Sequence, residues 1–177
     1  MAGPSVLFYI SGHGLGHSVR SCEVLNALHQ LEPDLFFYIR SNAPRWIFAA
    51  NLRCPFEYTF LDIDVGAVPK TPFTVDKPRT LRACTQLYER QSRIVEEELK
   101  FLKDKKVALL LADIPPLAFE VAARAGIPGV GVANFSWDWI YAAYAKEYPK
   151  FKELLERIRQ SQSYRSFPVL ERLLLFA

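Results

Sequence analysis

The sequence predicts an α/β domain in which helices cover both faces of a mainly parallel sheet of about six strands. Short apolar runs alternate along the chain with segments that carry apolar residues at helical spacing, which is the pattern of repeated βαβ units. The runs stay apolar almost throughout, as strands buried on both faces do. The 177 residues, 50% of them hydrophobic, are enough for a single domain with a substantial core.

The amino-terminal part predicts strands and short helices, followed by an irregular loop. The strands are expected over residues 5–10, 35–39 and 56–61, and the helices over residues 17–31 and 44–52. Ser18 is the expected N-cap of the first helix, and residues 40–42 are expected to form the turn after the second strand. Residues 62–76 contain Gly66 and show no periodicity, so they are expected to form a loop at the rim of a cleft.

Asp76 is expected to cap a long helix over residues 77–103, with Pro78 in its first turn. The elements expected after it are a strand over residues 107–111, a helix ending near 125, a strand over 130–133, and helices over 134–148 and 151–161. The final apolar run, residues 173–176, is a candidate sixth strand. Because an exposed apolar end is unfavourable, we expect the chain to be the front part of a longer protein.

Composition and charge exclude several classes of protein. Lysine and arginine number 22 against 19 acidic residues, a net charge of +3 that is too small and too dispersed for a nucleic-acid partner. The three cysteines, Cys22, Cys54 and Cys84, are isolated, which is typical of buried thiols in a reducing compartment. No signal peptide is recognisable, and no apolar run reaches the roughly 18 residues of a membrane span. We therefore expect a cytoplasmic protein.

Polar residues and glycines follow three of the predicted strands, at the point where each strand ends. Residues 12–17 follow the first strand, Asp113 follows the fourth, and residues 134–138 follow the fifth. Because ligands of open parallel sheets bind beyond the carboxyl ends of the strands, we expect these groups to form one site. The candidate substrate-binding residues are Gly12, His13, Gly14, Gly16, Asn134, Ser136, Trp137 and Asp138.

The glycine-rich turn does not match a dinucleotide or ATP motif. The third glycine of GxGxxG is replaced by His17, and Arg40 stands where an acidic residue would hold a ribose. An NADP site that uses Arg40 is a minor alternative. GxxxxGK[ST] is absent from the sequence, so no P-loop is expected, and we expect no cofactor.

Two histidines in this turn also suggest a metal site, but the pattern is incomplete. His13 and His17 have the spacing of a zinc pair on a helix, yet glycines interrupt the interval and no third ligand is identifiable. We therefore expect no metal.

A general base is a better-supported role for His17 than a metal ligand. The positive end of a helix dipole disfavours a protonated histidine, which leaves the ring able to accept a proton. Asp113, across the cleft, could hold the other ring nitrogen. The alternative is that His17 and Asp113 each cap a helix, and for a His–Asp pair considered alone that alternative is the stronger one.

The aromatic run near residue 140 also has two interpretations. Trp137 belongs to a stripe at helical spacing that is typical of core packing. Alternatively, Trp137 or Trp139 could form a stacking wall for a sugar ring. Asn134, Ser136 and Asp138 could bind hydroxyl groups or cap a helix. Arg20 and Arg45 could neutralise a phosphate, although a solvated surface role is the expected one.

Four segments together carry a family resemblance. They are Gly12-His-Gly-Leu-Gly-His17, Leu110-Leu-Ala-Asp113, Ala125-Gly-Ile-Pro128 and Asn134-Phe-Ser-Trp-Asp-Trp-Ile-Tyr141. With them, most of the chain resembles the N-terminal half of GT-B glycosyltransferases. It resembles in particular the glycosyltransferase-like region that precedes the sugar-kinase domain of L-arabinokinase-type proteins, and the stand-alone bacterial relatives of that region.

The resemblance implies a fold, a reaction and partners. Residues 1–177 would form one Rossmann-like, acceptor-side domain, and the C-terminal domain that mostly binds the nucleotide-sugar donor would be missing from this chain. His17 would be the general base, partnered by Asp113, in sugar transfer to the hydroxyl group of a small-molecule or glycan acceptor. Two alternatives stay open: a non-catalytic sugar or sugar-nucleotide binding module attached to a sugar kinase, and NADP-dependent redox chemistry.

Overall fold

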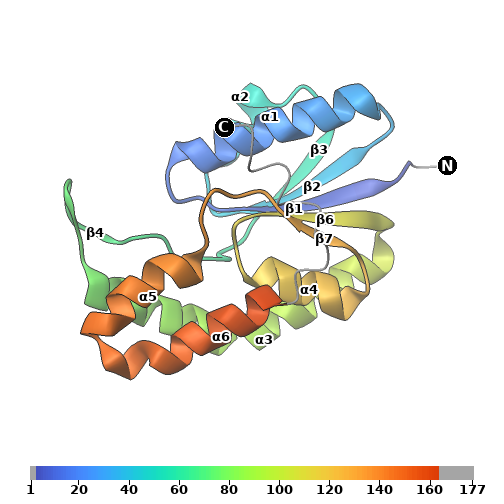
Figure 1. The fold of residues 1–177 in the computed structure, drawn as a ribbon. Coiled ribbons are helices and arrows are strands. Elements are labelled where there is room, and N and C mark those ends of the chain that lie inside the picture. The colour runs from blue at the N-terminus through green and yellow to red at the C-terminus, as the bar shows by residue number, and fades with distance from the viewer. Residues whose placement is uncertain (1–2, 164–177) are drawn as a thin grey trace.

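The computed structural model describes residues 3–163 and contains a five-stranded parallel sheet between layers of helices (Figure 1). The sheet order is β3-β2-β1-β6-β7. Its strands are β1 (Ser5–Ile10), β2 (Phe36–Ser41), β3 (Phe56–Phe60), β6 (Val107–Asp113) and β7 (Gly129–Gly131). The prediction of a Rossmann-like α/β fold with a mainly parallel sheet is thereby confirmed. Residues 173–176, the candidate sixth strand, lie outside the described residues.

The helices form a layer on each side of the sheet. In Figure 1, α1 and α2 cover one face, and α3, α4 and α6 lie across the other. The helices are α1 (Leu15–Leu31), α2 (Arg45–Asn51), α3 (Lys77–Asp104), α4 (Leu117–Ala125), α5 (Trp137–Glu147) and α6 (Lys152–Ser163), with a short 3-10 helix, η1 (Pro149–Phe151), before α6.

The central strand β1 explains both layers, because all six of its residues are buried. Phe8 and Ile10 point into the core beneath α1 and α2, whereas Leu7 and Tyr9 pack on the side of α3 and α4. Successive strand residues face opposite sides of a sheet, so an uninterrupted apolar strand needs cover on both sides. A third apolar cluster joins α5 and α6 to the first half of α3.

A buried charged group ties the middle of the sheet to α3. Glu98 accepts hydrogen bonds from Tyr9 Oη at 2.5 Å and from Arg40 Nε at 3.1 Å. The Arg40 guanidinium also lies 4.1 Å from the centre of the Phe101 ring. Arg40 and Ser41 are therefore the last residues of β2, not part of a turn as predicted, because the Glu98 carboxylate offers a buried partner for the arginine.

Two local predictions for the helices are corrected by the structure. The first helix begins at Leu15, with Gly14 at its N-cap, so Ser18 is not the cap but a buried residue one turn into the helix. Gly14 has a φ of 86°, a conformation that lets the chain turn early from β1 into α1. The helix predicted from residue 134 begins only at Trp137. At the start of α3, Asp76 accepts a hydrogen bond from Arg79 N, as predicted.

The predicted irregular loop contains regular structure. Strands β4 (Pro69–Thr71) and β5 (Thr74–Val75) pair as an antiparallel hairpin, which projects from the body of the molecule in Figure 1. Periodicity could not reveal strands this short.

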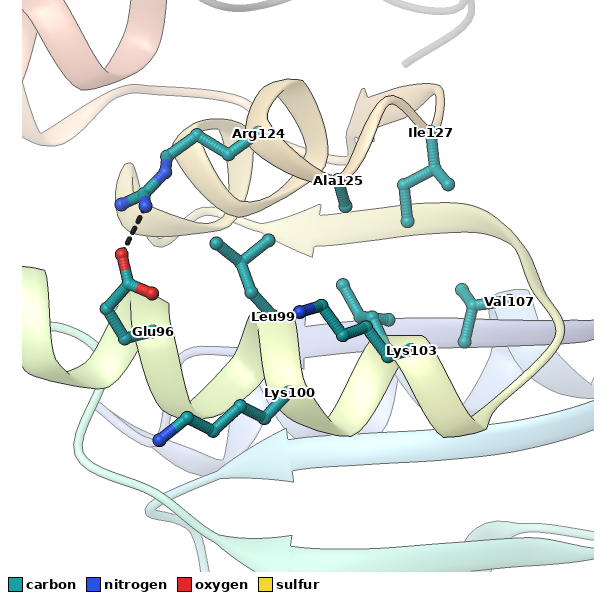
Figure 2. Close-up of a pocket in the computed structure, with 9 residues that line it drawn as sticks. Glu96, Leu99, Lys100, Lys103, Val107, Arg124, Ala125 and Ile127 are labelled. Carbon is teal, nitrogen blue, oxygen red and sulfur yellow. Dashed lines mark hydrogen bonds and ion pairs between the residues drawn. The ribbon is translucent and has the colours of Figure 1, made fainter.

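A groove of about 340 Å³ lies between the carboxyl halves of α3 and α4. Figure 2 shows Leu99 of α3 facing Ala125 and Ile127, with Arg124 paired to Glu96. The groove reaches Val107, where β6 begins, and so lies at the edge of the sheet opposite the carboxyl ends of the strands. None of the predicted site residues lines it. Among residues 3–163, no helix combines the length and apolar character of a membrane span.

Candidate functional site

The glycine corner between β1 and α1 is fixed by close backbone packing. Ser11 N donates to Asp113 O at 2.7 Å, which carries the pairing of β1 with β6 one residue further. A Cβ atom on Gly12 would lie 2.6 Å from Ala43 N, so only glycine allows this approach. By contrast, nothing lies within 4 Å of a Cβ atom placed on Gly16. The start of α1 therefore leaves open space beside His17.

His17 and Asp113 meet directly at this corner. Asp113 is the last residue of β6 and is fully buried, and its Oδ1 lies 2.8 Å from Nδ1 of His17. A carboxylate only accepts hydrogen bonds, so Nδ1 carries a hydrogen, and in the neutral ring the lone pair is then on Nε2. Among the described residues, no hydrogen-bond partner occupies Nε2, and the His17 side chain is 15% exposed. In the neutral ring, this nitrogen can accept a proton.

Arg20 and Ser21 complete the surroundings of Asp113. Ser21 was not recognised from the sequence, and Arg20 was expected to be solvated or to neutralise a phosphate, not to bind Asp113. Arg20 donates to Oδ1 through an Nη atom at 2.6 Å and to Oδ2 through Nε at 3.2 Å. Ser21 Oγ donates to Oδ2 at 2.9 Å. A spacing of three and four residues after His17 puts both side chains on its face of α1, and this spacing is the signal that could have found them.

Arg20 gives the carboxylate a neutralising partner. Its side chain is 36% exposed, so the guanidinium reaches the site from solvent. The same group lies 3.3 Å from Nδ1 of His17 and 3.5 Å from Asn134 Oδ1. His17, Asp113 and Asn134, which were predicted to share a site, are therefore brought together around Arg20.

His13 lies in a second histidine–aspartate pair. Its Nε2 is 3.2 Å from the main-chain oxygen of Asp64 and 3.3 Å from Oδ1 of the same residue. Burial alone would lower the pKa of His13, but hydrogen bonding to Asp64 and the negative charges of Asp64 and Asp62 raise the pKa above its usual value. Asp64 lies in the loop predicted to be irregular, where no sequence pattern marks it.

Trp137 belongs to the core instead of forming an open wall. Its ring is buried and stacks on Tyr141 with 5.2 Å between the ring centres, and its Nε1 donates to Asp64 Oδ2 at 2.9 Å. The predicted stacking surface for a sugar is therefore absent at Trp137, because Tyr141 covers the ring face. Trp139, in contrast, is 71% exposed.

The polar residues at the start of α5 diverge. Ser136 occupies the N-cap position but makes no side-chain capping bond. Asn134 is exposed beside Arg20, whereas Asp138 Oδ2 lies 3.9 Å from Arg159 Nε of α6. Asn134 is thus linked to His17 through Arg20, whereas Asp138 forms its ion pair with α6.

The structure also bears on the metal and NADP alternatives. Within residues 3–163, no group of three or more His, Cys, Asp or Glu side chains could hold a metal ion. Arg40 is buried against Glu98, so its guanidinium does not face a ligand as an NADP site would require.

Comparison with known proteins gives one close sequence relative. No protein-family model matches the chain. L-arabinokinase from Arabidopsis thaliana is 34% identical over 139 residues, which are 77% of this chain and 13% of that protein. The chain thus resembles L-arabinokinase, as the sequence motifs indicated, and spans about 13% of its length.

Solved structures give partial overlaps at low identity. UGT2 from Phytolacca americana, complexed with UDP-2fluoro-glucose and pterostilbene, is 16% identical and has a TM-score of 0.49, covering 75% of this chain and 31% of that chain. A UGT transferase from Siraitia grosvenorii in complex with UDP is 16% identical and has a TM-score of 0.48, covering 73% of this chain and 27% of that chain.

Proposed function

We propose that this chain, a relative of L-arabinokinase over most of its length, is the acceptor-side domain of a GT-B-type glycosyltransferase in which His17 is the general base. The observation that carries the proposal is the fixed orientation of His17. Asp113 holds Nδ1 at 2.8 Å. Nε2, which has no hydrogen-bond partner within residues 3–163, therefore lies at the carboxyl edge of the sheet, where ligands of such sheets bind.

The proposed reaction needs only groups that this site and a nucleotide sugar supply. Nε2 of His17 accepts the proton of an acceptor hydroxyl while its oxygen attacks the anomeric carbon of the sugar. The bond from that carbon to the diphosphate breaks, and the nucleoside diphosphate leaves with the bonding electrons. Asp113 stabilises the imidazolium that forms, and Arg20 and Ser21 hold the carboxylate in place.

The donor would be bound mostly by a second domain beyond this chain. The exposed groups near His17 include Asn134 and the Arg20 guanidinium, with open space at Gly16 and the exposed apolar side chains of Leu15 and Val19 beside it. Such a surface suits an acceptor that approaches with a hydroxyl group first. In this proposal, Gly16 provides room, His17 provides the base, and Asn134 offers a hydrogen bond to the acceptor.

The test compares His17→Ala with the wild-type full-length protein in a nucleotide-release assay over a panel of nucleotide sugars and hydroxyl acceptors. We expect a loss of about 10²-fold or more, the usual contribution of a general base. His29→Gln, at the far end of α1, is the matched control and should keep the wild-type rate. An unchanged rate in His17→Ala would show that this residue is not the base.

The same assay separates the alternative of a non-catalytic binding module attached to a sugar kinase. Such a module binds a sugar or sugar nucleotide but releases no nucleoside diphosphate with any acceptor. The sequence downstream of this chain gives an independent criterion. A second Rossmann-like half supports the transferase, whereas a sugar-kinase domain supports the binding module.

A further inference from the structure

Residues 61–68, here called the crossing segment, run along the carboxyl edge of the sheet from β3 toward α3. Near its start, Leu61 N donates to Ser41 O at the end of β2. Further on, Ile63 is buried in the cluster that holds Leu7 and Tyr9 of β1. At its end, Val68 N donates to Thr80 Oγ of α3. The crossing segment therefore spans the edge where the candidate site lies.

Asp64, in the middle of the crossing segment, contacts both the glycine corner and the start of α5. One carboxylate oxygen accepts from Trp137 Nε1 at the start of α5. The other is 3.3 Å from Nε2 of His13 in the glycine corner and has no hydrogen-bond partner among the described residues. The side chain is almost fully buried. A buried carboxylate is costly without a cationic partner, and His13 is the side chain placed to supply one.

His13 differs from His17 in the partner of its Nε2 atom. In His13 this nitrogen faces Asp64, and the opposite side of the ring packs on Gly66, where a Cβ atom would lie 2.2 Å from His13 Cγ. Nε2 of His13 is therefore engaged within the protein, although the side chain as a whole is 34% exposed. Val65, next along the segment, accepts through its main-chain oxygen from Tyr141 Oη, which adds a second tie to α5.

We propose that His13 and Asp64 form a positioning latch, in which protonated His13 holds the crossing segment against the glycine corner and so fixes the corner relative to α5. Its structural part stands independently of sugar transfer; its effect on catalysis rests on the function proposed above. The charged groups that act on His13 are Asp64 and Asp62, both in the crossing segment. From α5, His13 faces the uncharged Trp137 ring, 6.2 Å away between centres.

The sign of the pH dependence follows from the raised pKa of His13. A group whose folded-state pKa is raised contributes stability that is fully present below its unfolded value, about 6.5 for histidine, and is lost as pH rises through the folded value. The latch is thus closed at mildly acidic pH and opens as the pH rises past a midpoint above 6.5.

Trp137 gives a direct optical readout of the latch. Replacing Trp46 and Trp139 by Phe leaves Trp137 as the sole tryptophan, since the sequence contains three, and its indole contacts Asp64. Emission of this variant is recorded from about pH 5 to pH 9, the range in which histidines titrate. We expect a red shift with a midpoint above 6.5 as Trp137 loses its buried partner.

Variants of the three histidines identify the titrating group. In the sole-tryptophan background, His13→Gln should abolish the transition, whereas His17→Gln and His29→Gln should keep it. Asp64→Asn should move the midpoint to lower pH, and circular dichroism checks that each variant is folded. A transition that survives His13→Gln, or a flat titration in the sole-tryptophan protein, overturns the proposal.

Kinetics of the full-length protein then connect the latch to the site. His13→Gln should raise the acceptor KM about tenfold with kcat kept within about twofold, since it removes positioning and not the base. His17→Ala, by contrast, should lower kcat. An optical transition without sugar transfer refutes the transferase proposal alone; sugar transfer without a His13-dependent transition refutes the latch alone.

Discussion

Replacing Asp113 by Asn tests the buried centre of the candidate site with a change of a single atom. The asparagine keeps the shape of the side chain but has one acceptor oxygen and an NH₂ group in place of two acceptors. In the wild type, Oδ1 accepts from His17 and Arg20, and Oδ2 accepts from Ser21 and Arg20. The less damaging orientation puts the NH₂ group beside Ser21, whose hydroxyl can rotate to accept.

The expected magnitude follows from these contacts. The bonds from His17 and Ser21 lose their charge assistance, which is about 1 kcal/mol each in a buried setting. The Arg20 guanidinium is more than a third exposed, so its loss adds no more than about 1 kcal/mol after solvent screening. We therefore expect the free energy of unfolding to fall by about 2–3 kcal/mol.

Urea denaturation followed by circular dichroism measures this change. With an m-value of about 2 kcal/mol/M, the midpoint should fall by about 1–1.5 M. Asp34→Asn, at an exposed position, is the matched control and should stay within about 0.5 kcal/mol of the wild type. A midpoint for Asp113→Asn within about 0.25 M of the wild type would refute the assignment of Asp113 as the shared acceptor.

Three further substitutions probe the surrounding structure. Glu98→Ala leaves Arg40 buried without its carboxylate, and thermal unfolding should report a loss of about 3–5 kcal/mol; a change below about 1 kcal/mol contradicts the buried network. Gly16→Ala places its methyl group in open space at the second residue of α1, so it should stabilise the fold by no more than about 0.5 kcal/mol. It should also raise the acceptor KM, and an unchanged KM argues against acceptor entry there. Phe73→Ser, at a side chain 96% exposed on the hairpin, should change stability by less than about 0.5 kcal/mol in urea.

Most strands and helices could be predicted from the sequence, because a strand buried on both faces is a continuous apolar run. β1 is apolar from Val6 to Ile10, and the helices that cover it show apolar residues at helical spacing, so strand and helix positions were predicted within a few residues. The spatial order of the strands was not predicted, since it depends on which apolar surfaces meet. The early start of α1 escaped prediction because Gly14, not a polar side chain, provides the turn.

The sequence predicted those site residues that lie at the carboxyl ends of parallel strands, because the strand direction alone places them at the same edge of the sheet. His17 follows β1 and Asp113 ends β6, so both could be expected at the edge of the sheet where the carboxyl ends of the strands meet. Their direct contact also needs β1 and β6 to be neighbours, which was not predicted. Arg20 and Asp64 could not be placed in the same way. A helical arginine is usually solvated, and Asp64 lies in a segment without periodicity, where only tertiary contacts give it a partner.

The pairing of β1 with two strands of very different sequence separation has a consequence for biosynthesis. β1 pairs with β2 on one side and with β6 on the other, and the nascent chain contains β2 well before β6. Until β6 is made, one edge of β1 presents unpaired N–H and C=O groups beside strongly apolar side chains, a template for aggregation. His17 and Asp113 are 96 residues apart, and the strand that delivers Asp113 is also the one that covers this edge. The pairing of β6 with β1 therefore both brings Asp113 to His17 and covers the exposed edge of β1.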